Sequence, residues 1–369
     1  MYRNQDAHDE LLCASGCSGS FAGTPDCVFF AFGSTNCVDV LRVTPTEDST
    51  AVDVRVVAHF DAFPPRDTKD SEDDDIFNPN EVTAVHLSVP PRPAEEEKEE
   101  KETVAGPHVL SCVAGSGSGA VVLWDIDVDS GNATRAGALA GRDASPDENK
   151  VKCLARAGST VAAVTLGDGR CRVWDAATRT LLHTWDAAAF GLAPDTRPLM
   201  RFCALSPDGA RVTVAAASRV LKDRRAGCWL ASRGTADSAC AGALVALPGA
   251  AAMASCSLCE RPAGGATAAV GTCDGGVLVY AVGAGRGRAC RTLAAPACHG
   301  LVTTATNALA LADGPLLVLS AGTDGTCRVH RPPAAAPPAR CRACVGATAL
   351  LVAVAAVVLA ALLCLLRRV

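Results

Sequence analysis

Leu166 to Asp175, which reads LGDGRCRVWD, is the stretch that decides the predicted fold. A Gly-Asp-Gly turn leads into a short segment in which the apolar residues Cys171 and Val173 alternate with charged residues. An apolar period of two residues after a tight turn is typical of a half-buried β-strand. The stretch therefore predicts a β-hairpin whose second strand ends at Trp174-Asp175.

The same unit recurs along the chain. It is found again as GSGSGAVVLWD (115–125), TCDGGVLVY (272–280) and GTDGTCRVH (322–330). The residues that end these units recur about every 50 residues if Trp229 marks a further unit in the middle gap. The dipeptides Trp124-Asp125 and Trp174-Asp175 match the blade of a WD repeat, as does the strand and turn 205–209.

Extrapolation at the same interval places two more units before these, one ending near Phe32 and one near residue 80. No apolar period of 3.6 residues persists across the first 330 residues, so helices are not expected there. The predicted fold class is therefore all-β, with a seven-bladed WD-repeat β-propeller over residues 1–330 that is followed by a single C-terminal transmembrane helix.

The C-terminal segment predicts that membrane helix. Val345 to Leu366 contains no charged residue, and a helix of its length would span roughly 33 Å. A Pro- and Ala-rich stalk over 331–344 precedes it, and a short lumenal tail over 367–369 follows. Met1 to Glu10 is polar and lacks a secretory signal, so we expect a cytosolic propeller. The alternative is a buried core helix.

Composition limits the function. The chain has a net charge of −5, which provides no basic field for nucleic acid, and its 19 cysteines are interpreted mostly as reduced thiols because no signal directs the chain outward. Two acidic segments, at about 67–75 and 90–102, are interpreted as solvated insertions between blade strands. The alternative function for them is a docking site for a basic partner.

Common catalytic signatures are absent from the sequence. There is no GxxxxGK[ST], HExxH or GxSxG motif, which favours a protein that catalyses no covalent chemistry. The two C-x-x-C motifs, 256–259 and 341–344, could in principle form a zinc site, but chance pairs are easy among so many cysteines.

One predicted loop is longer than a simple hairpin needs. Leu11 to Phe32 reads LLCASGCSGSFAGTPDCVFFAF, which predicts a strand, a turn rich in Gly and Ser over Ser15 to Asp26, and a second strand. Small residues allow the backbone to fold closely around an ion or against a partner. The alternative is a loop without a function.

This segment resembles the WD-repeat exchange factors of the endoplasmic reticulum that activate the Sar-type small GTPase, the family of prolactin regulatory element-binding protein. The stretch 271–310, with the turn Cys298-His299-Gly300, is similar to the penultimate blade of that family. The resemblance implies a catalyst of GDP release that initiates COPII vesicle formation. It also implies a single-pass protein of the endoplasmic reticulum membrane with a lumenal C-terminus.

The resemblance also implies a site. Thr24, Pro25 and Asp26 correspond to the noncovalent exchange loop, where Thr24 replaces a bulkier residue and Asp26 stands where Asn is usual. Potassium is the implied ion, and other COPII or exit-site proteins are possible partners. The residues implied to contact the GTPase and to surround the ion are Ser15, Gly16, Cys17, Ser18, Gly19, Ser20, Phe21, Ala22 and Gly23. The alternative function is a tail-anchored WD-repeat scaffold without exchange activity.

Overall fold

A computed structural model of the chain divides it into a unit over Met1–Pro332 and a second unit over Pro333–Val369. The structure describes only residues of the first unit, and all statements below concern these residues. They are 13–19, 27–34, 36–45, 52–63, 80–90, 108–139, 149–218, 227–236, 244–250, 253–260, 266–282, 289–295, 299–300, 302–310, 316–324 and 326–330.

Five antiparallel sheets of four strands and one sheet of three strands make up the described part of this unit. Blade 1 contains β1 (Cys13–Gly19), β2 (Cys27–Gly33), β3 (Cys37–Pro45) and β4 (Val52–Asp61). Blade 2 contains β5 (Val82–Ser88), β6 (Val109–Ser116), β7 (Val121–Asp127) and β8 (Ala133–Leu139). Blade 3 contains β9 (Val151–Ala157), β10 (Thr160–Thr165), β11 (Cys171–Asp175) and β12 (Thr180–Trp185).

The remaining sheets follow the same order. Blade 4 contains β13 (Pro198–Leu205), β14 (Arg211–Ser218), β15 (Cys228–Gly234) and β16 (Val245–Ala246). Blade 5 contains β17 (Met253–Glu260), β18 (Ala266–Thr272), β19 (Val277–Val282) and β20 (Ala289–Ala295). The three-stranded sheet contains β21 (Thr303–Ala310), β22 (Leu316–Gly322) and β23 (Cys327–His330). Two short 3-10 helices, η3 (Ala188–Phe190) and η4 (Pro194–Thr196), join blade 3 to blade 4.

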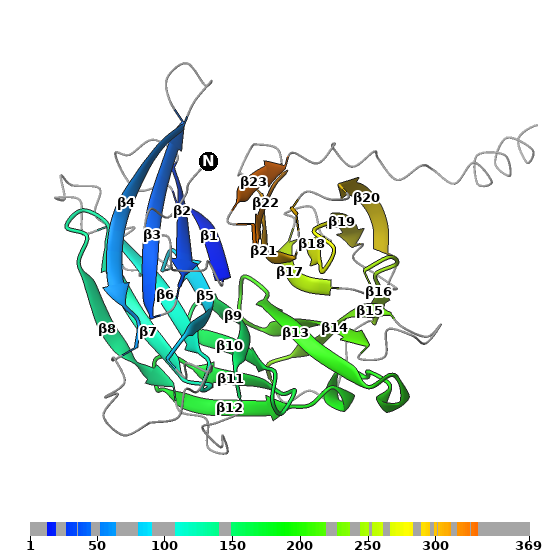
Figure 1. Cartoon of the computed structure of the whole chain (residues 1–369). Helices are drawn as coiled ribbons and strands as arrows, with labels where there is room; N and C mark the ends of the chain where they lie inside the picture. Colours follow the sequence, from blue (N-terminus) through cyan, green and yellow to red (C-terminus); the bar gives the residue numbers. More distant parts are fainter. Residues whose placement is uncertain are drawn as a thin grey trace, which may run out of the picture. The chain divides into compact units, whose positions relative to one another are not determined.

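The first strand of each sheet lies on the inside of a ring. In order along the chain, β1, β5, β9, β13, β17 and β21 each contact the next, and β21 contacts β1. Figure 1 shows these strands facing the centre, with β4, β8 and β12 at the periphery. The Cys13 thiol reaches the carbonyl oxygen of Val82, so β1 and β5 start side by side. The propeller that the sequence predicts is therefore present.

The number of blades is a correction to the sequence prediction. Seven blades were predicted, whereas the described residues form five four-stranded blades and the three-stranded sheet. No unit ends near residue 80, because residue 80 lies in a turn just before β5. The unit expected to end near Phe32 is also misplaced, because Phe32 lies on the second strand of blade 1 and not on its third. Strands β3 and β4 are long, and a further segment separates them from β5. The distance between the first two units is therefore longer than elsewhere, and a constant period predicts too many units.

The predicted transmembrane helix is not among the elements that the structure describes. No helix in the described part of the chain is long and apolar enough to cross a membrane. Val345 to Leu366, like the predicted stalk over 331–344 and tail over 367–369, lies outside the described residues.

The spacing of the repeats is confirmed for the rest of the chain. Each residue that ends a predicted unit lies on the third strand of its sheet. These residues are Trp124 (β7), Trp174 (β11), Trp229 (β15), Tyr280 (β19) and His330 (β23). The turns before these strands are tight where predicted, since Gly169 and Gly275 both have a positive φ, a conformation that glycine adopts without strain.

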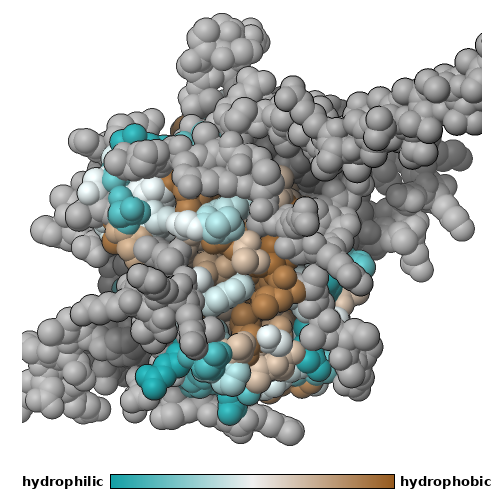
Figure 2. Space-filling view, turned by 90° about the vertical axis from the view of Figure 1, so that its right-hand side faces the viewer, coloured by the Kyte–Doolittle hydropathy of each residue, from teal (hydrophilic) through white to brown (hydrophobic). Residues whose placement is uncertain are grey.

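Small and β-branched residues fill the space between the sheets. One cluster joins blades 1 and 2 and includes Phe29, Val40 and Leu110, all at most 9% exposed. The rings of Phe60 and Trp124 also pack across these blades, with centroids 4.8 Å apart. Figure 2 shows that apolar residues gather in one area of the side it presents and that hydrophilic residues border them. The core is therefore distributed between neighbouring blades.

Cys13, Cys37, Cys112, Cys153, Cys171, Cys203, Cys228, Cys256, Cys259 and Cys273 are free thiols, as predicted. Cys171 and Cys327 lie in strands, as expected. Cys256 and Cys259 lie three residues apart on β17, so they point to opposite faces of the strand. This arrangement does not suit the zinc site considered for the motif. The acidic insertions follow β4 and β5, and 64–79 and 91–107 lie outside the described residues.

Candidate functional site

The hairpin of β1 and β2 contains the first part of the predicted exchange loop. The two strands pair from Cys13 opposite Gly33 to Gly19 opposite Cys27. The structure places Ser15, Gly16, Cys17, Ser18 and Gly19 within β1, whereas they were predicted to lie in a loop. The connection between the two strands is therefore limited to residues 20–26.

Ser15 contacts the fold itself. Its side chain is only 6% exposed, and its Oγ accepts a hydrogen bond of 3.1 Å from the backbone N–H of Leu87 in β5. The inner edge of β5 has no neighbouring strand in its own sheet, so its buried backbone N–H groups need other acceptors. The Ser15 hydroxyl group provides one for Leu87. Ser15 thus fixes β1 to blade 2, and the GTPase contact that the resemblance implies for it stays a prediction.

The second strand of the hairpin supports the first. Phe29 and Phe32 are buried, and Phe30 is half-buried, with the rings of Phe30 and Phe32 6.3 Å apart. At the base of the hairpin, burial raises the pKa of the Cys13 thiol to about 12, so this residue remains a neutral part of the core. The hairpin therefore has a well-packed base on which a connection can be presented.

The other predicted site residues cannot be placed. Ser20, Phe21, Ala22, Gly23, Thr24, Pro25 and Asp26 lie outside the described residues, and so does any potassium site that they would form. The described ends, Gly19 and Cys27, show where the connection leaves the propeller. It leaves at the end of β1, which is opposite the end at which Cys13 contacts Val82.

His299, which belongs to the turn that carries the family resemblance, has a structural environment. Its Nδ1 lies 3.2 Å from Oδ1 of Asp324 and 3.0 Å from Oγ1 of Thr326, and its Nε2 lies 2.8 Å from Oγ of Ser320. Ser320 in turn contacts Nε2 of His330 over 2.8 Å. This network ties the turn before β21 to the other two strands of its sheet, so His299 is a packing residue.

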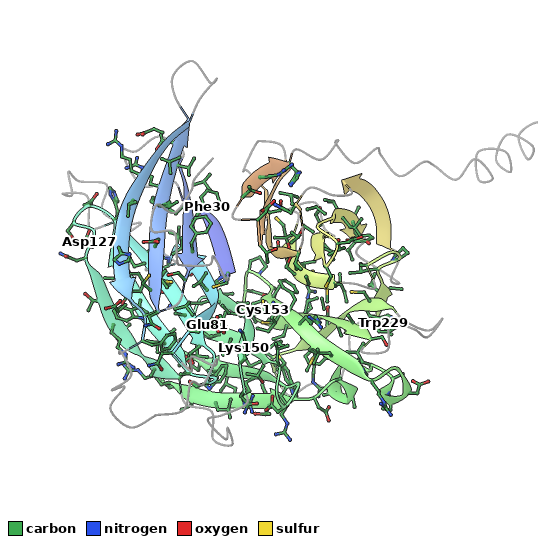
Figure 3. All side chains as sticks on the ribbon, viewed as in Figure 1. Phe30, Glu81, Asp127, Lys150, Cys153 and Trp229 are labelled. Atoms are coloured by element: carbon green, nitrogen blue, oxygen red, sulfur yellow. The ribbon has the colours of Figure 1, made fainter. Side chains whose placement is uncertain are left out.

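A group of cations near the inner strands was missed by the sequence analysis. Lys152 in β9 and Arg201 in β13 occupy β-bulges, which aim side chains away from the regular pleat. Burial, followed by the nearby Arg201, lowers the pKa of Lys152. Lys150 forms an ion pair of 3.2 Å with Glu81, and Figure 3 shows both beside the inner strands. Isolated lysines and arginines in strands give no sequence signal for such a group.

The described part of the site offers groups that a partner protein can contact. The hairpin provides backbone groups and the half-buried ring of Phe30, and no cluster of three His, Cys, Asp or Glu residues in the described ranges could hold a metal ion. Such a surface can bind a partner and select one of its conformations.

Comparisons with known proteins identify the fold. No protein-family model matches the chain, and no curated protein matches it. Among solved structures, 693 chains match, as expected for a common fold. A chain of a COPII outer coat vertex on membranes has a TM-score of 0.51 at 13% identity, over 82% of this chain and 66% of that chain.

Two further structures are similar. A chain of the COPII coat assembled on membranes has a TM-score of 0.51 at 13% identity, over 82% of this chain and 37% of that chain. A chain of the Chaetomium thermophilum Polycomb Repressive Complex 2 bound to GSK126 has a TM-score of 0.52 at 10% identity, over 89% of this chain and 97% of that chain. The chain thus spans only part of both COPII chains, and these identities show the β-propeller fold alone.

Proposed function

We propose that this propeller acts in vesicle traffic as a guanine nucleotide exchange factor for a Sar-type small GTPase. The observation that carries the proposal is the hairpin of blade 1. A strand of small residues, Cys13–Gly19, is fixed to blade 2 and leads directly into the connection 20–26, whose sequence resembles the exchange loop of the family. An exchange factor needs such an element, since it must present a short segment from a rigid base.

The mechanism requires no covalent step. The connection 20–26 would bind the nucleotide-free GTPase more strongly than the GDP-bound form, so that the phosphate and magnesium contacts weaken and GDP leaves. Excess GTP then refills the site. A potassium ion bound by the connection would order its backbone. The described residues contribute by holding the base of the hairpin, because Ser15 and Phe29 are buried in it.

The proposed context is the assembly of the COPII coat at the endoplasmic reticulum. Two similar solved structures are described as COPII coat assemblies on membranes, which supports this context. The similarity to a chain of a Polycomb complex limits that support, because the same fold has other uses. The partners that follow from the proposal are a Sar-type GTPase and COPII components.

A direct assay tests the proposal. The full chain is added to a Sar-type GTPase loaded with a fluorescent GDP analogue in the presence of excess GTP, and the release rate is measured with and without potassium. We expect release to accelerate with the concentration of the chain. A rate equal to that of the GTPase alone would refute exchange activity and would leave the scaffold function, in which the propeller binds partners without catalysis.

A further inference from the structure

The inner strands of blades 3 and 4 place two thiols against each other. Cys153 lies in β9 and Cys203 in β13, and the two strands are in contact. The Cys153 thiol donates to the carbonyl oxygen of Cys203 over 3.5 Å, and the Cys203 thiol lies 3.6 Å from the carbonyl oxygen of Cys153. Each side chain therefore lies over the backbone of the other residue, although 50 positions separate them in the sequence. Figure 3 labels Cys153 near the inner strands.

The two thiols have different environments. Cys153 is half-buried, whereas Cys203 is 1% exposed. A hydrogen bond from the Cys203 thiol lowers the pKa of Cys153 and outweighs its burial, and the Lys152 ammonium lowers that pKa further. Burial raises the pKa of Cys203 well above its usual value. The less buried residue is therefore also the one whose thiol loses its proton more readily, which is the property of an attacking thiol.

Neighbouring cysteines of the core have other properties. Burial raises the pKa of Cys171 strongly, and it raises that of Cys228 to about 12. The Cys228 thiol donates to the sulfur of Met253 over 3.5 Å, so it faces a thioether that cannot form a disulfide. These residues behave as small apolar side chains. Cys171 therefore provides a matched control for the pair.

We propose that Cys153 and Cys203 are an oxidisable dithiol that closes to a disulfide between blades 3 and 4. With a peroxide as oxidant, the Cys153 thiolate attacks one peroxide oxygen, the O–O bond breaks, and the other oxygen leaves as hydroxide and takes up a proton. The sulfur of Cys203 then attacks the sulfenic sulfur of Cys153, the S–O bond breaks, and water leaves with the proton of Cys203. The two thiols lose two electrons, which the peroxide gains.

The disulfide would join two inner strands that are held together by packing and weak thiol contacts. A covalent link between positions so far apart in sequence restricts the unfolded chain, so the oxidised propeller resists unfolding more than the reduced one. This property is independent of the exchange activity proposed above, since it depends only on blades 3 and 4.

Peptide mapping of the full chain tests the proposal. The reduced protein is treated with a small excess of hydrogen peroxide, free thiols are blocked with N-ethylmaleimide, and the chain is digested with trypsin without reductant. Cleavage after Lys152, Arg156, Arg201 and Arg211 releases the peptides 153–156 and 202–211. We expect one species that contains both peptides and is lighter than their sum by two hydrogens, which dithiothreitol separates again.

Variants and a second measurement complete the test. The Cys153→Ser and Cys203→Ser variants should lack the linked species, and Cys171→Ser should retain it. The oxidised wild-type chain should melt several degrees above the reduced chain, and dithiothreitol should reverse the shift. The proposal would be overturned if both peptides were recovered with blocked thiols or as separate sulfinic acids, or if Cys153 were linked to another cysteine. These outcomes are measured on the wild-type chain, so they decide the question even if a variant fails to fold.

Discussion

The Oγ of Ser15 in β1 accepts a hydrogen bond of 3.1 Å from the backbone N–H of Leu87 in β5. This contact joins the inner strands of blades 1 and 2 at a buried position, where neither group can turn to water instead. The base of the hairpin, which contains Ser15, therefore stabilises the propeller. We assign the exchange function to a different part of the hairpin, the connection 20–26.

Replacement of this serine should affect stability. The Ser15→Ala variant leaves the Leu87 N–H buried without its acceptor, and we expect the free energy of unfolding to fall by about 1 to 3 kcal/mol. Chemical denaturation measures this change. The control is Ser159→Ala, at an exposed turn between β9 and β10, which should be nearly neutral. An unchanged unfolding midpoint for Ser15→Ala would show that the bond contributes nothing.

The glycine at the end of β2 should not tolerate a larger side chain. A Cβ at Gly33 would lie 2.5 Å from the sulfur of Cys13 and 2.6 Å from Cγ1 of Val82. The Gly33→Ala variant should therefore lose about 1 to 3 kcal/mol of stability through overpacking. Gly300→Ala is the matched control, because a Cβ there meets no atom within 4 Å. Equal melting temperatures for the two variants would contradict this account.

The cations at the inner strands give a prediction of the opposite sign. Lys152 is disfavoured by burial and by the neighbouring Arg201, so Lys152→Met should raise the free energy of unfolding by about 1 kcal/mol. The gain should be smaller at 1 M salt, where charge repulsion is screened. Lys150→Met is the control, since it removes the ion pair with Glu81 and should not stabilise. Destabilisation by Lys152→Met would mean that the ammonium has a favourable partner.

The pattern of the third strands could be predicted from the sequence, but the number of blades could not. Trp124, Trp174 and Tyr280 lie on third strands as their spacing indicates, since aromatic residues are rare in this chain and mark the repeat clearly. The region before them has no such marker. An interval extrapolated through long strands and an acidic insertion counted one unit too many there.

The candidate site was predicted only in part. The run from Ser15 to Gly19 has a composition typical of loops, yet it forms an inner strand that pairs with β2 along its whole length and contacts β5 through Ser15. The contact between Cys153 and Cys203 depends on which blades are adjacent and on the register of their inner strands. Neither follows from local sequence, so no motif indicated that pair.

The turn at Asp324 predicts a dependence on acid. Burial alone would raise the pKa of this carboxyl group, but hydrogen bonds from Thr326, the Gly300 N–H and His299 hold it well below the usual value. A depressed folded-state pKa contributes stability above the unfolded value of about 3.9, and this contribution is lost as the pH falls below it. The melting temperature should therefore decline between about pH 4 and pH 2.

A variant identifies the group responsible. Asp324→Asn should melt at a lower temperature at neutral pH and should show a shallower decline in acid than the parent chain. Asp125→Asn, at an exposed position in β7, serves as the control and should follow the parent curve. Parallel curves for the parent chain and Asp324→Asn would assign the acid sensitivity to other carboxyl groups.

The measurement that tests the central claim most directly is GDP release by a chain in which only the connection 20–26 is replaced by a Gly-Ser linker. The control replaces the exposed residues Asp129 and Ser130, in the turn between β7 and β8, by Gly-Ser. We predict that the first variant loses the acceleration of release while its melting temperature stays within about 2 °C of the parent, and that the control retains both. Full exchange activity in the first variant, or an equal loss in the control, would contradict the account.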